Sequence, residues 1–168
     1  MMVNRQRGVR ISQEPLEAFL RRVKKRLGVE DLGVTVCFVS DSEIAGMNER
    51  FRKKSGPTDV LSFPAVNVGH GRTKRRKRIY TEGAEDTEGT EKTRRRRGSR
   101  GAENYLGDIA IAPETARRYA KKNGRNLSDE LRVLILHGVL HLMGYDHETD
   151  RGEMNRIELK MRRRFGLA

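Results

Sequence analysis

The order of apolar patterns along the chain limits the fold to helices and strands packed around one core. The first pattern has helical spacing, with Ser12 as a candidate N-cap and Gly28 as the end of the helix, and its apolar positions are Leu16, Phe19, Leu20, Val23 and Leu27. Residues 33–40 form a β-branched, apolar run, which predicts a strand buried on both faces of a sheet. Helical and strand-like patterns then follow one another to the C-terminus.

The remaining patterns complete a mixed α/β prediction. Asp41 is expected to cap a helix that turns Ile44, Met47 and Phe51 toward the core. Further strands are predicted at residues 59–64 and 106–112, and further helices at residues 113–122, 128–143 and 149–165. The predicted fold class is α/β (α+β), with a small mixed sheet packed by helices; the strand order is left open.

The length of the chain favours a single domain. Domains usually contain about 100 to 200 residues, and this chain has 168 residues. At this size a core forms without disulfides or a structural metal. The single cysteine, Cys37, is predicted to be a small buried hydrophobe. No apolar run is long enough to span a bilayer and no signal-type apolar segment follows the N-terminus, so neither membrane insertion nor secretion is expected.

The charge balance favours a polyanionic partner. The chain has 36 Lys and Arg against 23 Asp and Glu, a net charge of +13. Residues 67–104 hold twelve of the basic and six of the acidic residues but only five apolar ones, so they are predicted to be a disordered basic insert in a single domain of residues 1–168. The insert is either an RNA-binding arm or a solvated segment without an essential role. Tryptophan is absent and most Phe and Tyr fall in apolar patterns, so base stacking is scarcely indicated.

Three of the four histidines fall within eleven residues and predict a metal site. His137 and His141 are four residues apart on a predicted helix, so their imidazoles project from one face. Gly144 suits a left-handed position after the helix, and the resulting turn brings His147 beside the other two. Three neutral imidazoles leave one position of a zinc ion to water or substrate, which is typical of a catalytic site. The histidines are therefore expected to meet at the mouth of a cleft.

Metzincin proteases share this histidine spacing, but they carry a glutamate after the first histidine as the general base. Here that position is Gly138, which cannot accept a proton. Asp146 and Glu148 are nearby carboxylates that lie beyond the turn. A metal-dependent peptidase or amidase therefore stays open only as an alternative that uses another base.

The histidine block resembles the signature of the YbeY family of bacterial endoribonucleases. Residues 137–147, HGVLHLMGYDH, match the family's H-G-x-L-H-L-x-G-Y-D-H. Residues 57–64 are similar to its P-T-[DN]-V-L-S-F-P, and residues 106–109 to its L-G-D-I. Residues 48–52 resemble N-x-x-[FY]-R, with Arg52 in the position of the family's functional arginine. The basic insert is longer and more charged than the connection usual in the family.

The resemblance implies a single-strand-specific, metal-dependent endoribonuclease that acts in 16S rRNA 3′ end maturation and ribosome quality control in the cytoplasm. Its partners would be single-stranded RNA, the rRNA precursor, the small ribosomal subunit and assembly factors. One zinc ion (Zn2+) would be held by His137, His141 and His147, and Arg52 would bind phosphate and stabilise the developing charge. Asp146 and Asp108 are candidates for orienting the histidines.

Two further interpretations of the metal site stand beside a catalytic zinc site. A non-enzymatic ribosome-assembly factor would use a structural zinc and bind RNA through its basic surface without cutting it. Three histidines also suit nickel, copper or iron, so zinc is inferred from the donor set and not from a unique signature. The oligomeric state is not indicated by the sequence.

Overall fold

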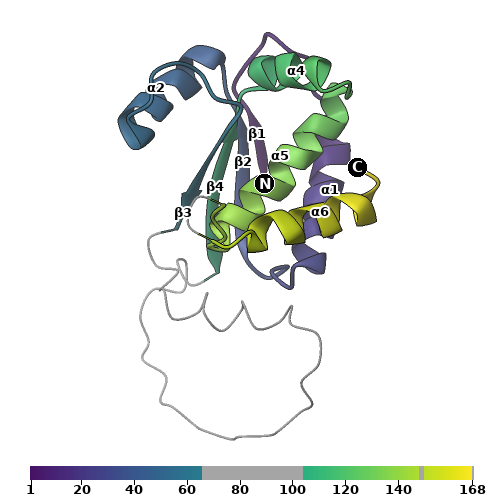
Figure 1. Ribbon diagram of the computed structural model, residues 1–168. Coiled ribbons are helices and arrows are strands. Elements are labelled where there is room, and N and C mark those ends of the chain that lie inside the picture. The colour runs from purple at the N-terminus through teal and green to yellow at the C-terminus, as the bar shows by residue number, and fades with distance from the viewer. Residues whose placement is uncertain (66–103, 148–149, 168) are drawn as a thin grey trace, which may run out of the picture.

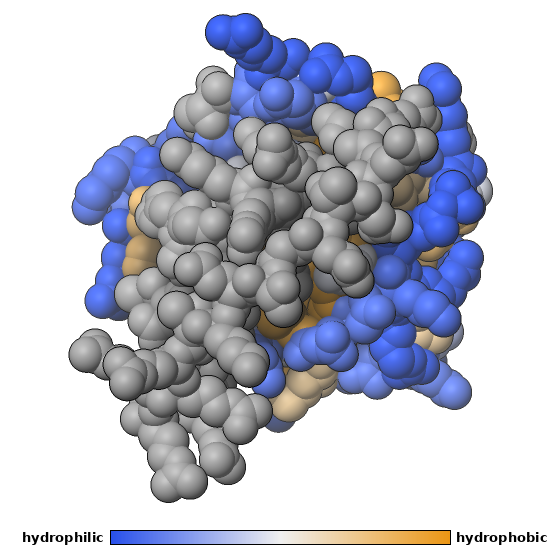
Figure 2. Space-filling model, turned by 90° about the horizontal axis from the view of Figure 1, so that it is seen from below, coloured by the Kyte–Doolittle hydropathy of each residue, from blue (hydrophilic) through white to orange (hydrophobic). Residues whose placement is uncertain are grey.

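The computed structural model describes residues 1–65, 104–147 and 150–167. The predicted basic insert lies outside the described residues except for Asn104, and so do His70 and Glu148. Within the described parts of the chain, no helix is both long and apolar enough to cross a membrane. Seen from below, the described residues around the rim carry mainly hydrophilic side chains, with smaller apolar areas between them (Figure 2).

A four-stranded mixed sheet forms the centre of the fold (Figure 1). Its strands, in spatial order, are β1 (Met2–Asn4), β2 (Gly33–Phe38), β4 (Tyr105–Ile111) and β3 (Val60–Pro64). β1, β2 and β4 run parallel, whereas β3 pairs with β4 in the antiparallel direction. The small mixed sheet is therefore confirmed. β1 was not predicted, because three residues are too few to show an alternating pattern.

The described residues form five helices: α1 (Gln13–Arg26), α2 (Asp41–Arg52), α4 (Pro113–Lys122), α5 (Leu127–Leu142) and α6 (Glu153–Phe165). Ser12 is the N-cap of α1, as predicted, whereas the N-caps of α2 and α5 differ from the predicted positions. Ser40, and not Asp41, caps α2 in a reciprocal capping box with Glu43, whose backbone N–H donates to the serine hydroxyl over 3.2 Å. Asn126 caps α5 by accepting from the backbone N–H of Asp129 at 2.8 Å. Ser, Asn and Asp are all good caps, so neighbouring candidates are hard to separate in the sequence.

The two faces of the sheet are covered unequally. Helices α1, α5 and α6 lie together on one face, over the alternate β2 residues Val34, Val36 and Phe38 (Figure 1). The other face holds a smaller cluster around Ile44 of α2. The prediction that β2 is buried on both faces was therefore wrong, and Cys37 is only partly buried on this smaller face. Burial still raises the pKa of the Cys37 thiol.

Helix α5 approaches the sheet closely at Gly138. A Cβ atom added there would lie 2.8 Å from two side-chain carbons of Ile109 in β4. Ile109 is fully buried, so it has little room to move away. Glycine at this position lets the helix and the strand come together.

We expect Gly138→Ala to lower the free energy of unfolding by about 1–3 kcal/mol, as overpacking of a core does. The better helix propensity of alanine, about 1 kcal/mol, offsets only part of this cost. Urea unfolding followed by circular dichroism measures the difference.

Gly46→Ala is the matched control for this prediction, because Gly46 is an exposed helical glycine whose added Cβ would meet nothing within 4 Å. The control should be as stable as the wild type or more so. If Gly138→Ala behaved like the control, the close contact would not constrain the packing of α5.

Candidate metal centre

The three predicted histidines come together at the C-terminal end of α5. His137 and His141 lie on its last turns, and Gly144 then takes a φ of 88°, the left-handed conformation predicted for it. The chain turns back, and His147 joins the pair. The ring centroids are 4.6 Å apart for His137 and His141, and 5.7 Å and 5.4 Å from these two to His147. One ligand atom from each histidine lies within 4.8 Å of the others.

The geometry of the ring nitrogens fits a metal ion. The Nε2 atoms of His137 and His141 face each other at 3.1 Å. Two nitrogens bound to one tetrahedral zinc at about 2.0–2.1 Å would be separated by about 3.3 Å. Burial lowers the pKa of His141, and the charges of His137 and His147 lower it further. At neutral pH the ring is therefore uncharged, which is the form that binds a metal.

Glu158 of α6 contacts His137 at Nδ1, the ring nitrogen that does not face His141. The Nδ1 atom of His137 lies 3.0 Å from Oε2 of Glu158, whose side chain is largely buried. Nδ1 donates to the ionised carboxylate, so Nε2 keeps its lone pair toward the other histidines. Such a carboxylate–histidine pair fixes the orientation of a metal ligand and raises its basicity.

Arg162 completes the environment of Glu158 as its second partner. Arg162, one turn further along α6, donates to the other carboxylate oxygen, Oε1. Burial alone would raise the pKa of Glu158, but the hydrogen bond and charge of His137, together with Arg162, outweigh it and hold that pKa below its usual range. The carboxylate is therefore ionised at neutral pH.

Sequence reasoning missed Glu158 and named other carboxylates instead. Asp108 accepts a hydrogen bond from the Tyr105 hydroxyl at 2.6 Å and is not among the residues that line the histidine pocket. Asp146 does line that pocket, and its charge raises the pKa of His141. Glu158 could have been found from α6 itself, since it shares the buried face of that helix with Met154 and Met161. A carboxylate in an apolar stripe needs a partner.

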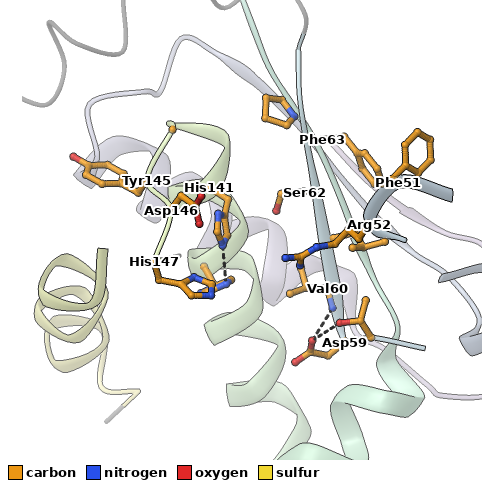
Figure 3. A pocket seen from close by; sticks show the side chains of 15 residues that line it. Phe51, Arg52, Asp59, Val60, Ser62, Phe63, His141, Tyr145, Asp146 and His147 are labelled. Atoms are coloured by element: carbon orange, nitrogen blue, oxygen red, sulfur yellow. Dashed lines mark hydrogen bonds between the residues drawn. The ribbon is translucent and has the colours of Figure 1, made fainter. Parts of the chain in front are cut away.

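A pocket of about 480 Å³ opens beside the histidines. The histidines and residues 144–146 form one wall, and β3 with the end of α2 forms the other. Arg52 extends from the end of α2 toward the histidines across this pocket (Figure 3). The predicted phosphate-binding residue and the three predicted metal ligands thus line the same pocket.

The loop after α2 is held in place by Asn48. Its buried side-chain amide donates to the carbonyl oxygen of Gly56 at 2.9 Å. Lys53 ends the helix in the left-handed conformation, with a φ of 58°. These two features fix the direction in which the chain leaves Arg52 and runs on to β3.

The burial of Phe51 differs from the predicted one. It was expected to face the core, but its side chain is exposed to 58% and lines the rim of the pocket. The helix-spacing argument failed because α2 lies on the thinly covered face of the sheet, where only Ile44 and Asn48 of this helix are buried.

We expect Glu158→Gln to weaken zinc binding by about 10- to 100-fold, the usual effect of changing a residue that orients a metal ligand. The neutral amide is a weaker acceptor for Nδ1 of His137 and leaves Arg162 without its ionic partner. Competition with a chromophoric chelator measures the affinity.

His141→Ala serves as the reference for loss of binding in this experiment, and the exposed Glu49→Gln as the charge-matched control. Wild-type affinity in Glu158→Gln, with the fold intact by circular dichroism, would remove Glu158 from the metal site.

Comparisons with known proteins identify the family. The family model described as "Endoribonuclease YbeY" matches residues 2–166. Curated proteins named "Endoribonuclease YbeY" include one from Koribacter versatilis, 36% identical over 99% of this chain and 86% of its own length. Another, from Solibacter usitatus, is 33% identical over 90% of this chain and 78% of its own length.

A solved structure has the same fold. The solution structure of a Thermotoga maritima protein matches with a TM-score of 0.55 and 26% identity, over 95% of this chain and 83% of that one. The resemblance seen in the histidine block and the predicted fold class are both confirmed. The chain belongs to the YbeY family of endoribonucleases.

Proposed function

We propose that this protein is a zinc-dependent endoribonuclease that cleaves single-stranded RNA, and that residues 1–168 form one catalytic domain. One observation carries the proposal: Arg52 reaches across a single pocket toward His137, His141 and His147. A cation site and an arginine that face each other across a pocket suit a phosphodiester, because its phosphate can be contacted from both sides.

Each side chain has a distinct task in this reaction. The three histidines would hold the zinc ion, which would supply an acidified water and a Lewis acid for a phosphoryl oxygen. Arg52 binds the phosphate through its planar, permanently charged guanidinium. It also stabilises the negative charge that develops on the phosphate oxygens as the ester bond breaks. Glu158 keeps Nε2 of His137 turned toward His141, where the metal would be held.

The shape and charge of the protein support single-stranded RNA as the substrate. A pocket of about 480 Å³ is the size of a small-ligand site, which suits one or two nucleotides of a strand. Unpaired strands can turn single bases out toward a protein, whereas a duplex keeps its bases paired and stacked. The net charge of +13 favours association with a polyanion.

The cellular role that we propose follows the family. It is maturation of the 3′ end of 16S rRNA and ribosome quality control, in the cytoplasm. The rRNA precursor, the small ribosomal subunit and its assembly factors would be the partners. The enzyme's own contribution to this role is the cleavage of a phosphodiester bond at the pocket described above.

Neither the metzincin route nor a structural zinc is favoured by the geometry. A metzincin-type peptidase needs a glutamate where Gly138 stands, and any side chain there would run into Ile109. A structural zinc usually has four protein ligands, whereas the metal-binding group found among the described residues has three. An open site of three histidines favours catalysis.

Cleavage of a single-stranded fragment of the 16S rRNA 3′ region by the wild type and by His147→Ala, side by side in the same metal-defined buffer, tests the proposal. His147 is exposed, so its loss should leave the fold intact. We expect cleavage by the wild type alone, and none of the same sequence in a duplex.

Contaminating nuclease would affect both preparations of this pair equally. Equal cleavage by wild type and His147→Ala would separate the reaction from the histidine site. No cleavage by a metal-loaded wild type would overturn the proposed activity.

We expect Arg52→Ala to keep its zinc but to lower kcat by about 10²- to 10³-fold, as loss of one charge-stabilising donor does. Arg52→Lys should recover part of this loss, because an ammonium keeps the charge but not the bidentate geometry.

Zinc content and single-turnover cleavage are measured on the same samples of the Arg52 variants. Lys121→Ala, an exposed cation on α4, is the charge-matched control. Wild-type rates in Arg52→Ala would remove the arginine from the reaction.

A further inference from the structure

An aromatic ring stands exposed at the rim of the histidine pocket. Phe51, in the last turn of α2, is exposed to 58%. The other large hydrophobic side chains that are exposed among the described residues are Met1, Tyr119 and Leu159, and none of them lines this pocket. An exposed phenylalanine keeps its apolar surface in contact with water, so that surface does not stabilise the fold. Its position beside a binding pocket therefore points to a ligand.

The Phe51 ring is supported from the protein side. Phe63 of β3 meets it in a T-shaped arrangement, with ring centroids 5.1 Å apart and an angle of 72° between the planes. Phe63 packs against the buried cluster on the smaller face of the sheet, so it anchors the pair. Figure 3 shows the two rings together beside Arg52, away from the histidines. The result is a positioned aromatic surface that is open to solvent.

Two arginines flank this aromatic surface. The guanidinium of Arg50 lies 5.4 Å from the Phe51 ring centroid, in the range of a cation–π contact. Arg52, the next residue on the other side, extends into the pocket. An aromatic ring with one cation over it and a second at the next residue suits a single strand, in which flat bases alternate with phosphates. An apolar protein segment would gain nothing from the two charges.

We propose that Phe51 is a stacking site for a base of the RNA strand, next to the phosphate that Arg52 contacts. This inference rests on the proposed function and adds to it a subsite for a nucleobase. Stacking on one face of a ring is tolerant of base identity, because every base has a π-face. The subsite therefore positions an unpaired strand and selects against paired bases, which are not free to stack on the protein.

A single-tryptophan reporter tests the contact directly, because the chain contains no tryptophan. The full-length, zinc-loaded Phe51→Trp variant is mixed with a single-stranded 2′-O-methyl adenosine hexamer, and the intactness of the hexamer is checked on a gel afterwards. We expect the tryptophan fluorescence to be quenched by this hexamer and not by an abasic hexamer of equal charge. Tyr119→Trp, on α4 outside the pocket, should be quenched by neither.

A substitution series separates stacking from simple apolar contact. In fluorescence anisotropy with the labelled hexamer, Phe51→Ala and Phe51→Leu should both raise Kd by about 5- to 150-fold. This is the range found when the aromatic side chain that stacks on one base is removed. Phe51→Tyr should restore binding close to the wild type. The fold and zinc content should be unchanged in all variants, since the side chain is mostly exposed.

Each outcome of these measurements has a defined meaning. Wild-type affinity in Phe51→Leu would indicate an apolar contact without stacking, as for a protein partner, and would overturn the inference. Equal quenching by the abasic hexamer would do the same. If the wild type cleaves and binds RNA while the Phe51 variants match it, only the stacking site fails. If the wild type neither binds nor cleaves RNA, the proposed function fails with it.

Discussion

The close packing of α5 against β4 at Gly138 is the constraint on which the rest of the molecule depends. It brings the helix that carries two of the histidines down onto the central strand of the sheet, with Ile109 filling the space that a side chain would need. β3 pairs with the same strand and forms the opposite wall of the pocket. The distance between α5 and β3 on the two sides of the pocket is therefore set by packing in the core.

The contact between His137 and Glu158 joins the histidine group to the C-terminal helix. α6 buries Met154 and Met161 in the main core, and the same face presents Glu158 to the histidine. The orientation of His137 thus depends on the packing of a helix outside the histidine motif. A substitution in the apolar face of α6 would therefore change the orientation of His137, although no residue of that face lines the pocket.

The histidines were predicted from local spacing and Arg52 from its match to a family motif, whereas Glu158, which acts through a tertiary contact, was not predicted. The interval of four residues and the left-handed Gly144 were enough to bring three histidines together. Glu158 was missed because its partner lies 21 residues away on another helix, and periodicity does not say which helices touch. Phe51 was predicted to be buried because it lies on the apolar face of its helix. Helical spacing does not show whether other residues pack over that face.

The antiparallel pairing of β3 with β4 has a consequence for the long sequence between them. Pro64 lies opposite Gly107 in the register, so the chain leaves and re-enters the sheet at neighbouring points beside the pocket. The cost of closing such a connection rises by only about 0.6 kcal/mol for each doubling of its length. A long connection at this place therefore adds little closure entropy, and β3 and β4 pair beside it and carry one wall of the pocket.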